Sequence, residues 1–186
     1  MDALELLMSR ASTGRLQAPA PSAEALETMF KAAARAPDHD RMRAWRFVVM
    51  VGDQLERFGE QICVLMKSRD AAISPEMLER ERQKYRRAPM IIVAAARPGP
   101  IDKIPEIEQM LSAGAAAQNV LLAAHALGYG AMWRTGALAY DDDVKTILGL
   151  ERSDKILGFI YMGTPVAAPP AQKRPEPSEF AVHWAG

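Results

Sequence analysis

Positive charge is concentrated in the stretch AARAPDHDRMRAWRF, which covers residues 33–47. It contains His39 and four arginines, namely Arg35, Arg41, Arg43 and Arg46. Guanidinium groups bind phosphate and carboxylate oxygens through paired, charge-assisted hydrogen bonds. The whole chain has 23 Lys and Arg against 23 Asp and Glu, so no global field draws it to nucleic acid or to an anionic membrane. The stretch therefore predicts a local site for an anionic ligand.

Two further polar clusters lie at the ends of predicted elements. Residues 10–15, RASTGR, can enclose a phosphate with two guanidinium groups, two hydroxyl groups and free loop amides. A structural interpretation is also open, in which Arg10 complements the end of a helix while Ser12 and Thr13 form turns. The third cluster ends a predicted strand and consists of Trp133, Arg134, Thr135 and Gly136. Its tryptophan could also be a core residue, although Trp-Arg-Thr at the end of a strand is an unusual choice for simple filling.

Several familiar catalytic and binding motifs are missing. The sequence has no GxGxxG or GxxxxGK[ST] phosphate loop and no GxSxG nucleophile motif. Its one cysteine and three histidines are far apart and lack the spacing of metal ligands. The three aspartates at 141–143 stand at the start of a predicted helix, where capping and the helix dipole explain them. The sequence therefore predicts neither a metal site nor a catalytic triad.

The spacing of apolar residues predicts the elements that must position these clusters. Helices are expected over residues 2–8, 22–36, 53–66, 74–87, 105–127 and 141–148, and strands over 45–51, 89–96, 131–135 and 155–162. The helix at 74–87 is highly charged, so we expect a solvated or partly mobile excursion. From Gly163 onwards, repeated prolines predict an extended tail rather than a packed element. Unevenly spaced strands favour an α+β arrangement over a doubly wound parallel sheet.

The overall composition is that of a soluble globular protein, with 49% hydrophobic and 25% charged residues. A length of 186 residues suits a single domain that spans the whole chain, 1–186. The single cysteine, Cys63, excludes an internal disulfide and fits a reducing compartment. The N-terminus does not resemble a signal peptide, and no apolar run reaches about 18 residues. We therefore expect a cytoplasmic protein that does not bind membranes.

Taken in order, the three clusters resemble the FMN-dependent nitroreductase family. The motifs that carry the resemblance are an N-terminal Arg-x-Ser-x-x-Arg, then RAPDH followed by W-x-F-x-V, then GYGAMWRTGAL. MDALELL at the start, EQMLSAG in the long helix and DKILGFIYMGTP near the end extend the likeness over nearly the whole chain. The sequence is most similar to a compact bacterial branch of the family.

The resemblance implies a nitroreductase-like α+β fold, with a central, mostly antiparallel sheet flanked by helices. It also implies an obligate homodimer that binds FMN at the subunit interface. By matching position, Arg10, Ala11 and Ser12 would hold the phosphate and ribityl end of the flavin. Arg35 and His39 would reach the flavin from the partner subunit. The isoalloxazine ring would lie along Trp133, Arg134, Thr135 and Gly136, the last of these near flavin N5.

A further match concerns the end of the long helix. This helix end matches a stretch that the compact branch associates with the nicotinamide nucleotide. The matching residues are Ala123, Ala124, His125, Ala126, Leu127 and Gly128. Packing of a helix end explains such small residues equally well.

The activity that the resemblance implies is transfer of hydride from NAD(P)H through FMN to a nitro compound, a quinone or a similar electron-poor small molecule. Because the flavin supplies the redox chemistry, no protein acid, base or metal is required. An FMN-binding protein of the same fold with a different redox role is an alternative. A nucleic-acid-binding module is a third possibility, and zero net charge together with the lack of a helix-turn-helix or RNP pattern counts against it.

One departure from the family pattern concerns the residues before the first long strand. The family often has Gln-Pro-Trp where this chain has Arg43-Ala44-Trp45. If Arg43 faces the pyrimidine edge of the flavin, its charge should raise the flavin potential; alternatively it points to solvent or pairs with Asp40. Ala44 lacks the ring that fixes φ in proline, so it should loosen the turn.

Overall fold

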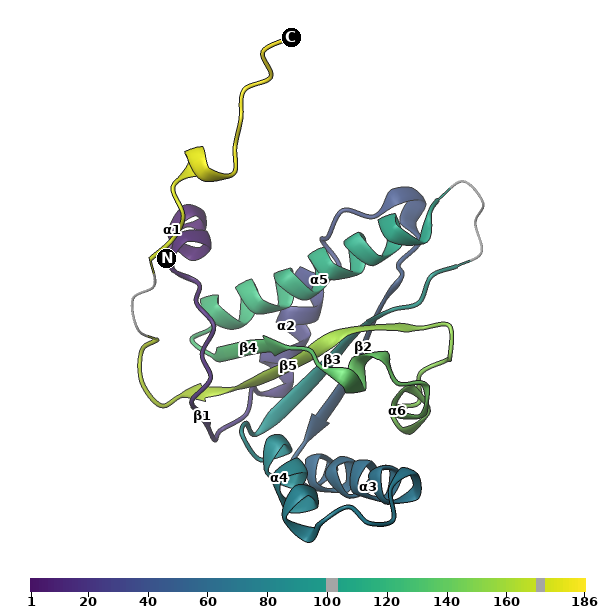
Figure 1. Cartoon of the computed structure of the whole chain (residues 1–186). Coiled ribbons are helices and arrows are strands. Elements are labelled where there is room, and N and C mark those ends of the chain that lie inside the picture. The colour runs from purple at the N-terminus through teal and green to yellow at the C-terminus, as the bar shows by residue number, and fades with distance from the viewer. Residues whose placement is uncertain (100–103, 170–172) are drawn as a thin grey trace.

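The computed structural model describes residues 1–99, 104–169 and 173–186. A five-stranded antiparallel sheet forms its centre (Figure 1). The neighbouring strands are, in order, β1 (Leu16–Gln17), β5 (Lys155–Pro165), β3 (Met90–Ala96) and β2 (Trp45–Val51). The remaining strand, β4 (Gly130–Arg134), pairs with β5 on the side opposite β3. The predicted α+β class is confirmed, because every strand pair is antiparallel.

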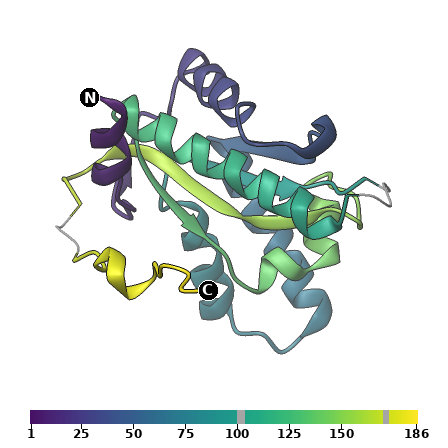
Figure 2. The ribbon, with the colours of Figure 1, turned by 90° about the horizontal axis from the view of Figure 1, so that it is seen from above.

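Helices cover both faces of the sheet (Figures 1 and 2). One face is covered by α2 (Ala23–Ala33) and α5 (Glu106–Ala126), and the other by α3 (Asp53–Arg69), α4 (Pro75–Tyr85) and α6 (Asp142–Ile147). The short helix α1 (Ala3–Ser9) packs against α5. The described residues also form short turns of 3-10 helix, namely η1 (His39–Arg41), η2 (Ala137–Tyr140) and η3 (Pro177–Glu179). No described helix is both long and apolar enough to cross a lipid bilayer.

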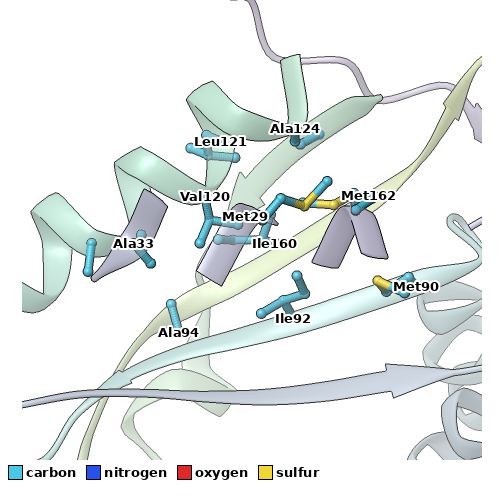
Figure 3. Close-up of a cluster of buried hydrophobic side chains, with 14 of the residues drawn as sticks. Met29, Ala33, Met90, Ile92, Ala94, Val120, Leu121, Ala124, Ile160 and Met162 are labelled. Carbon is cyan, nitrogen blue, oxygen red and sulfur yellow. The ribbon is translucent and has the colours of Figure 1, made fainter. Parts of the chain in front are cut away.

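The central strand β3 separates two hydrophobic clusters. Met90, Ile92 and Ala94 face α2 and α5, as Figure 3 shows, whereas Ile91 and Val93 face the α3 side. Side chains alternate along a strand, so a strand with helices on both faces must be apolar at every position. This explains why the sequence MIIVAAA is continuously apolar and why all seven of its residues are buried.

The prediction of a solvated excursion at residues 74–87 is wrong for one face of α4. Leu78, Glu81 and Tyr85 are buried there, and the Tyr85 ring packs edge-on against Phe58 with 5.0 Å between the ring centroids. The helix is charged because its other face meets water, and the short apolar stripe is sufficient to attach it to α3. A β-carbon at Gly59 would lie 3.0 Å from the Tyr85 ring, so the two helices approach closely at this point.

The strand β5 is longer than predicted, and the two-residue strand β1 was not predicted. β5 continues through Gly163 to Pro165, where Leu16 and Gln17 pair with its last two residues. Proline is tolerated there because it lies at the end of the strand. The extended tail therefore begins after Pro165, and residues 173–186 run past α1 away from the sheet (Figure 1).

A polar network joins the start of β5 to the end of β3. The carboxylate of Asp154 is fully buried and accepts two hydrogen bonds from the Arg97 guanidinium, both 2.8 Å long. It also accepts a bond from the backbone N–H of Glu151 at 2.9 Å. The backbone N–H of Arg97 donates to the carbonyl of Ala44 at 2.6 Å. This network ties the loop before β2 to the sheet.

Candidate functional site

The N-terminal polar cluster lies beside β4, more than a hundred residues away in the sequence. The backbone N–H of Thr13 donates to the carbonyl of Ala131 at 2.9 Å, and the Thr13 side chain is buried. A β-carbon placed on Gly14 would lie 3.8 Å from Nη2 of Arg134. The structure therefore brings two of the three predicted clusters together.

Within the N-terminal cluster, the Arg10 and Ser12 side chains remain available for a ligand. Arg10 caps α1, and its backbone N–H donates to the carbonyl of Leu6 at 3.2 Å. Arg10 and Ala11 are half-buried, and Ser12 is exposed. Among the described residues no carboxylate pairs with the Arg10 guanidinium. Capping thus accounts for the backbone of Arg10 and leaves its charge unused.

Trp133 combines a core position with a fixed orientation. Its ring is half-buried against the α2 and α5 cluster, and Nε1 donates to the carbonyl of Leu157 at 3.0 Å. Gly158 has φ +154°, and a β-carbon there would lie 2.1 Å from Trp133 Nε1 and 2.7 Å from the Arg134 carbonyl oxygen. Much of the Trp133 ring therefore lies in the core, as the structural interpretation proposed. At position 158, beside the ring, only glycine fits.

A Gly158→Ala substitution is expected to lower the free energy of unfolding by about 1–3 kcal/mol, because the new methyl group must displace the indole or the backbone of β4. Chemical denaturation measures this loss. Gly149→Ala is the matched control, since Gly149 also has positive φ (+70°) but open space around its α-carbon. Equal losses in the two variants would show that backbone strain, and not the contact with Trp133, is responsible.

A cavity of about 410 Å³ opens at the end of β4, on the face of the sheet that carries α3 and α4. Three predicted site residues line it, namely Arg134, Thr135 and Gly136. Apolar walls come from side chains of α3, η2 and β5, namely Met66, Leu138, Phe159 and Tyr161. Small-molecule sites are typically concave and largely apolar, with volumes of about 300–1,000 Å³ and a few polar groups that orient the ligand. This cavity has those properties.

Cationic side chains outnumber anionic ones in the cavity wall. Lys84, Arg87 and Arg134 line it, with Glu81 as the only carboxylate among the lining residues. The Arg134 guanidinium carbon lies 5.7 Å from the Tyr161 ring centroid, within range of a cation–π interaction. No ion pair involving Arg87 or Arg134 occurs in the described part of the chain. The cavity is therefore suited to an anionic or electron-rich ligand that also presents a flat apolar surface.

The Glu81 carboxylate is bound by two residues of its own helix. It is paired with the ammonium group of Lys84, and it accepts a hydrogen bond from the Tyr85 hydroxyl at 2.7 Å. Burial, and then the bond to Glu81, raise the pKa of Tyr85, so this hydroxyl stays protonated and donating. Sequence reasoning missed Glu81, Lys84 and Arg87 because α4 looked like a solvated helix. The i, i+3, i+4 spacing of Glu, Lys and Tyr was the available signal.

His39 lies at the other end of α5 from the N-terminal cluster, whereas Arg35 lies nearer the middle of that helix, since Asn119 donates to the Ala32 carbonyl and Ser112 to the Pro37 carbonyl. His39 Nδ1 is 2.8 Å from Oε2 of Glu108 in the first turn of α5, and this bond raises the pKa of His39. At the last turn of α5, the Ser9 hydroxyl is 3.0 Å from Nε2 of His125. A helix rises about 1.5 Å per residue, so the 17 positions from Glu108 to His125 span about 26 Å. One chain alone does not bring His39 to the N-terminal cluster.

The basic loop that precedes β2 has an unusual backbone. Asp40, Arg41 and Arg43 have φ values of +52°, +56° and +49°, in the left-handed region that L-residues seldom occupy. The Arg43 side chain is exposed and does not line the cavity, and its backbone N–H donates to Asp38 at 2.9 Å. Within the described ranges Arg43 makes no ion pair with Asp40. Ala44 is buried. Strained backbone of this kind is often found at ligand sites.

The segment from Ala123 to Gly128 is partly buried, with Ala126, Leu127 and Gly128 exposed. Ala124 is fully buried, and its carbonyl accepts a bond from the Tyr129 N–H at 2.9 Å. Gly128 ends the helix with φ +82°, and His125 contacts Ser9 of α1.

The aspartates at 141–143 have a structural role. Asp141 caps α6 by accepting a bond from the Asp143 N–H at 3.0 Å, as predicted, and Arg69 binds Asp141 at 2.9 Å. In residues 1–99, 104–169 and 173–186, no group of three His, Cys, Asp or Glu side chains is arranged to hold a metal ion.

The chain is similar in sequence to the proteins of one known family. The sequence profile of the nitroreductase family matches residues 7–164. The protein named "Putative NAD(P)H nitroreductase YdjA" of Escherichia coli (strain K12) is 40% identical over 188 residues, which cover 99% of this chain and 100% of that protein.

Two solved structures are similar in fold. A nitroreductase-like family protein from Bacillus cereus superposes with a TM-score of 0.85 at 21% identity, covering 100% of this chain and 97% of that one. A nitroreductase with bound FMN from Bacteroides fragilis NCTC 9343 superposes with a TM-score of 0.72 at 19% identity, covering 99% of both chains. The predicted nitroreductase-like fold is thereby confirmed.

Proposed function

Because the chain belongs to the nitroreductase family, we propose that it is an FMN-dependent oxidoreductase that uses NAD(P)H as electron donor and reduces nitro compounds, quinones or similar electron-poor molecules. The observation that carries this proposal is the cationic, aromatic-lined cavity at the end of β4, where Arg134 of the cavity wall lies near Gly14 of the N-terminal cluster. The name of the E. coli relative specifies an NAD(P)H nitroreductase, and the B. fragilis structure contains FMN.

The residues present fit FMN. A phosphate dianion requires unpaired cations and hydroxyl or amide donors, and the segment from Arg10 to Ser12 offers both. A flat ring system requires apolar and aromatic walls, which Phe159 and Tyr161 supply. When bound, FMN would accept hydride from NAD(P)H and pass it to the acceptor. The chain's own residues then have to bind the phosphate, orient the ring, and leave room for a second flat molecule.

We propose a homodimer as the functional form, with Arg35 and His39 of one subunit reaching the site of the other. The distance along α5 between His39 and the N-terminal cluster supports this proposal, since a two-fold partner can bring opposite ends of α5 together. The exposed face of α5 carries Ile107 (60% exposed) and Leu111 (66% exposed). The neighbouring α1 exposes Leu4 (74%) and Met8 (82%). Apolar patches of this kind mark surfaces that are buried on association.

Flavin binding is tested by the absorbance spectrum of the protein as purified and by titration with FMN. A yellow protein that oxidises NADPH or NADH when a nitroaromatic compound or a quinone is added supports the proposed reaction. A yellow protein that leaves every such acceptor unreduced would favour the alternative, an FMN protein with another redox role. A colourless protein that binds no added FMN would exclude both.

An Arg134→Gln substitution is expected to weaken FMN binding about ten- to a hundred-fold, because hydrogen bonds to charged groups contribute about 1.5–3 kcal/mol. Fluorescence titration of FMN measures the change. Arg57→Gln is the control, since Arg57 pairs with Asp53 on the exposed side of α3 and does not line the cavity. Similar affinity in both variants would place the flavin elsewhere.

A further inference from the structure

The wall of the cavity contains an ion pair, Glu81–Lys84. Neither the binding of a flat ligand nor the stability of the fold requires this pair to be charged. The Glu81 side chain is only 7% exposed, while that of Lys84 is 43% exposed, and both residues line the cavity. A carboxylate that leaves water loses hydration energy, and it lies here in the last turns of α4, where the helix dipole also disfavours negative charge. A neutral glutamine at this position could accept the same bond from Tyr85. The charge itself therefore needs an explanation.

We propose that Glu81 sets the electrostatic potential of the cavity by neutralising Lys84, and so controls how strongly the site favours reduced over oxidised flavin. The inference rests on the proposed function, because it assumes that FMN occupies this cavity. Addition of hydride gives the flavin ring one more negative charge, so every net positive charge in the wall stabilises the reduced form preferentially. With Glu81 ionised, Arg87 and Arg134 remain as the uncompensated cations. Glu81 and Lys84 thus adjust the preference for reduced flavin through their charges, and they take no direct part in the reaction.

The size of the effect follows from Coulomb's law. A unit charge about 10 Å away, at an effective dielectric constant of about 20, changes the preference for an anion by roughly ten-fold. The Lys84 side chain is partly exposed and that of Glu81 is buried. Salt therefore weakens the electrostatic effect of this pair, but less than it weakens that of a fully exposed pair. We therefore expect changes of about ten-fold in the ratio of the dissociation constants of oxidised and reduced FMN.

The test compares this ratio, or the equivalent midpoint potential of bound FMN, among four proteins. Glu81→Gln keeps the shape and the acceptor oxygen for Tyr85, exposes the Lys84 charge, and is expected to shift the ratio about ten-fold toward reduced FMN. Lys84→Gln is expected to shift it about ten-fold the other way. The double variant should lie within about three-fold of the wild type, because the two changes cancel.

Two controls separate charge from structure. Tyr85→Phe removes the hydrogen bond to Glu81 but no charge, so the ratio should stay within about two-fold of the wild type. Glu27→Gln removes a carboxylate from the exposed pair with Lys31 on α2, across the sheet, and should also leave the ratio unchanged. If Glu81→Gln fails to fold, Lys84→Gln carries the same test with the opposite sign.

The possible failures are distinguishable. A wild-type protein that binds no FMN overturns the proposed function and this inference together. A protein that binds FMN, but whose Glu81→Gln and Lys84→Gln variants both keep the wild-type ratio within about two-fold, overturns the inference alone. Shifts of both variants in the same direction would also overturn it, because opposite charges must act with opposite signs.

Discussion

A Leu111→Asp substitution is expected to convert the proposed dimer to a monomer and to weaken FMN binding about a hundred-fold or more. Leu111 lies on the exposed face of α5 with 66% of its surface open to water in the isolated chain. In the proposed dimer this face is buried, so a carboxylate would lose its hydration there without gaining a partner. The monomer would lack the Arg35 and His39 contributed by the second subunit.

Sedimentation or light scattering measures the oligomeric state, and fluorescence titration measures FMN affinity. Val64→Asp is the matched control, because Val64 is equally exposed (67%) but lies on α3, across the sheet from α5. That variant should remain a dimer and keep its affinity. A Leu111→Asp protein that is monomeric yet binds FMN as well as the wild type would show that one chain holds the complete site. A variant that stays dimeric would place the interface on another surface.

An Arg97→Met substitution is expected to lower the free energy of unfolding by about 3–5 kcal/mol at neutral pH, because it leaves the fully buried Asp154 carboxylate without its counter-ion. The backbone bond from position 97 to Ala44 can still form, so the loss reports on the side chain. Chemical denaturation gives the value. Arg57→Met, which breaks only an exposed pair with Asp53, should be close to neutral.

The pH dependence of the same network has a definite sign. Burial alone would raise the pKa of Asp154, but the hydrogen bonds from Arg97 and from the Glu151 N–H, with the charges of Arg97 and Arg46, outweigh it and lower that pKa. A carboxyl group whose pKa is lowered by folding contributes stability above its unfolded pKa of about 3.9, and that stability is lost as pH falls through the folded value. The deficit of Arg97→Met should therefore be full at neutral pH and shrink under acid conditions. A deficit independent of pH would assign it to lost packing.

Local structure was largely predictable because its causes are local. The capping box of Asp2 and Glu5 starts α1, and the Ser22 hydroxyl caps α2 by accepting a bond from the Ala25 N–H at 3.1 Å. The continuous apolar run of β3 predicted a strand buried on both faces. These signals lie within a few consecutive residues, from the three-residue spacing of a cap to the seven residues of β3, so the local chain itself determines the geometry. The two-residue strand β1 carries no such signal, since only its partner in β5 makes it a strand.

For the site, the sequence alone determined which residue types are present. Basic and hydroxyl side chains stand at the ends of predicted elements, in a chain that has no net charge. Only the tertiary structure decided which of them meet. It set Gly14 of the N-terminal cluster beside Arg134, and it separated His39 from that cluster by most of the length of α5. It also turned Glu81 and Lys84 of a seemingly solvated helix toward the cavity. The reason is physical: pairing across a sheet and packing between helices depend on contacts between residues far apart in the chain, which short-range spacing does not encode.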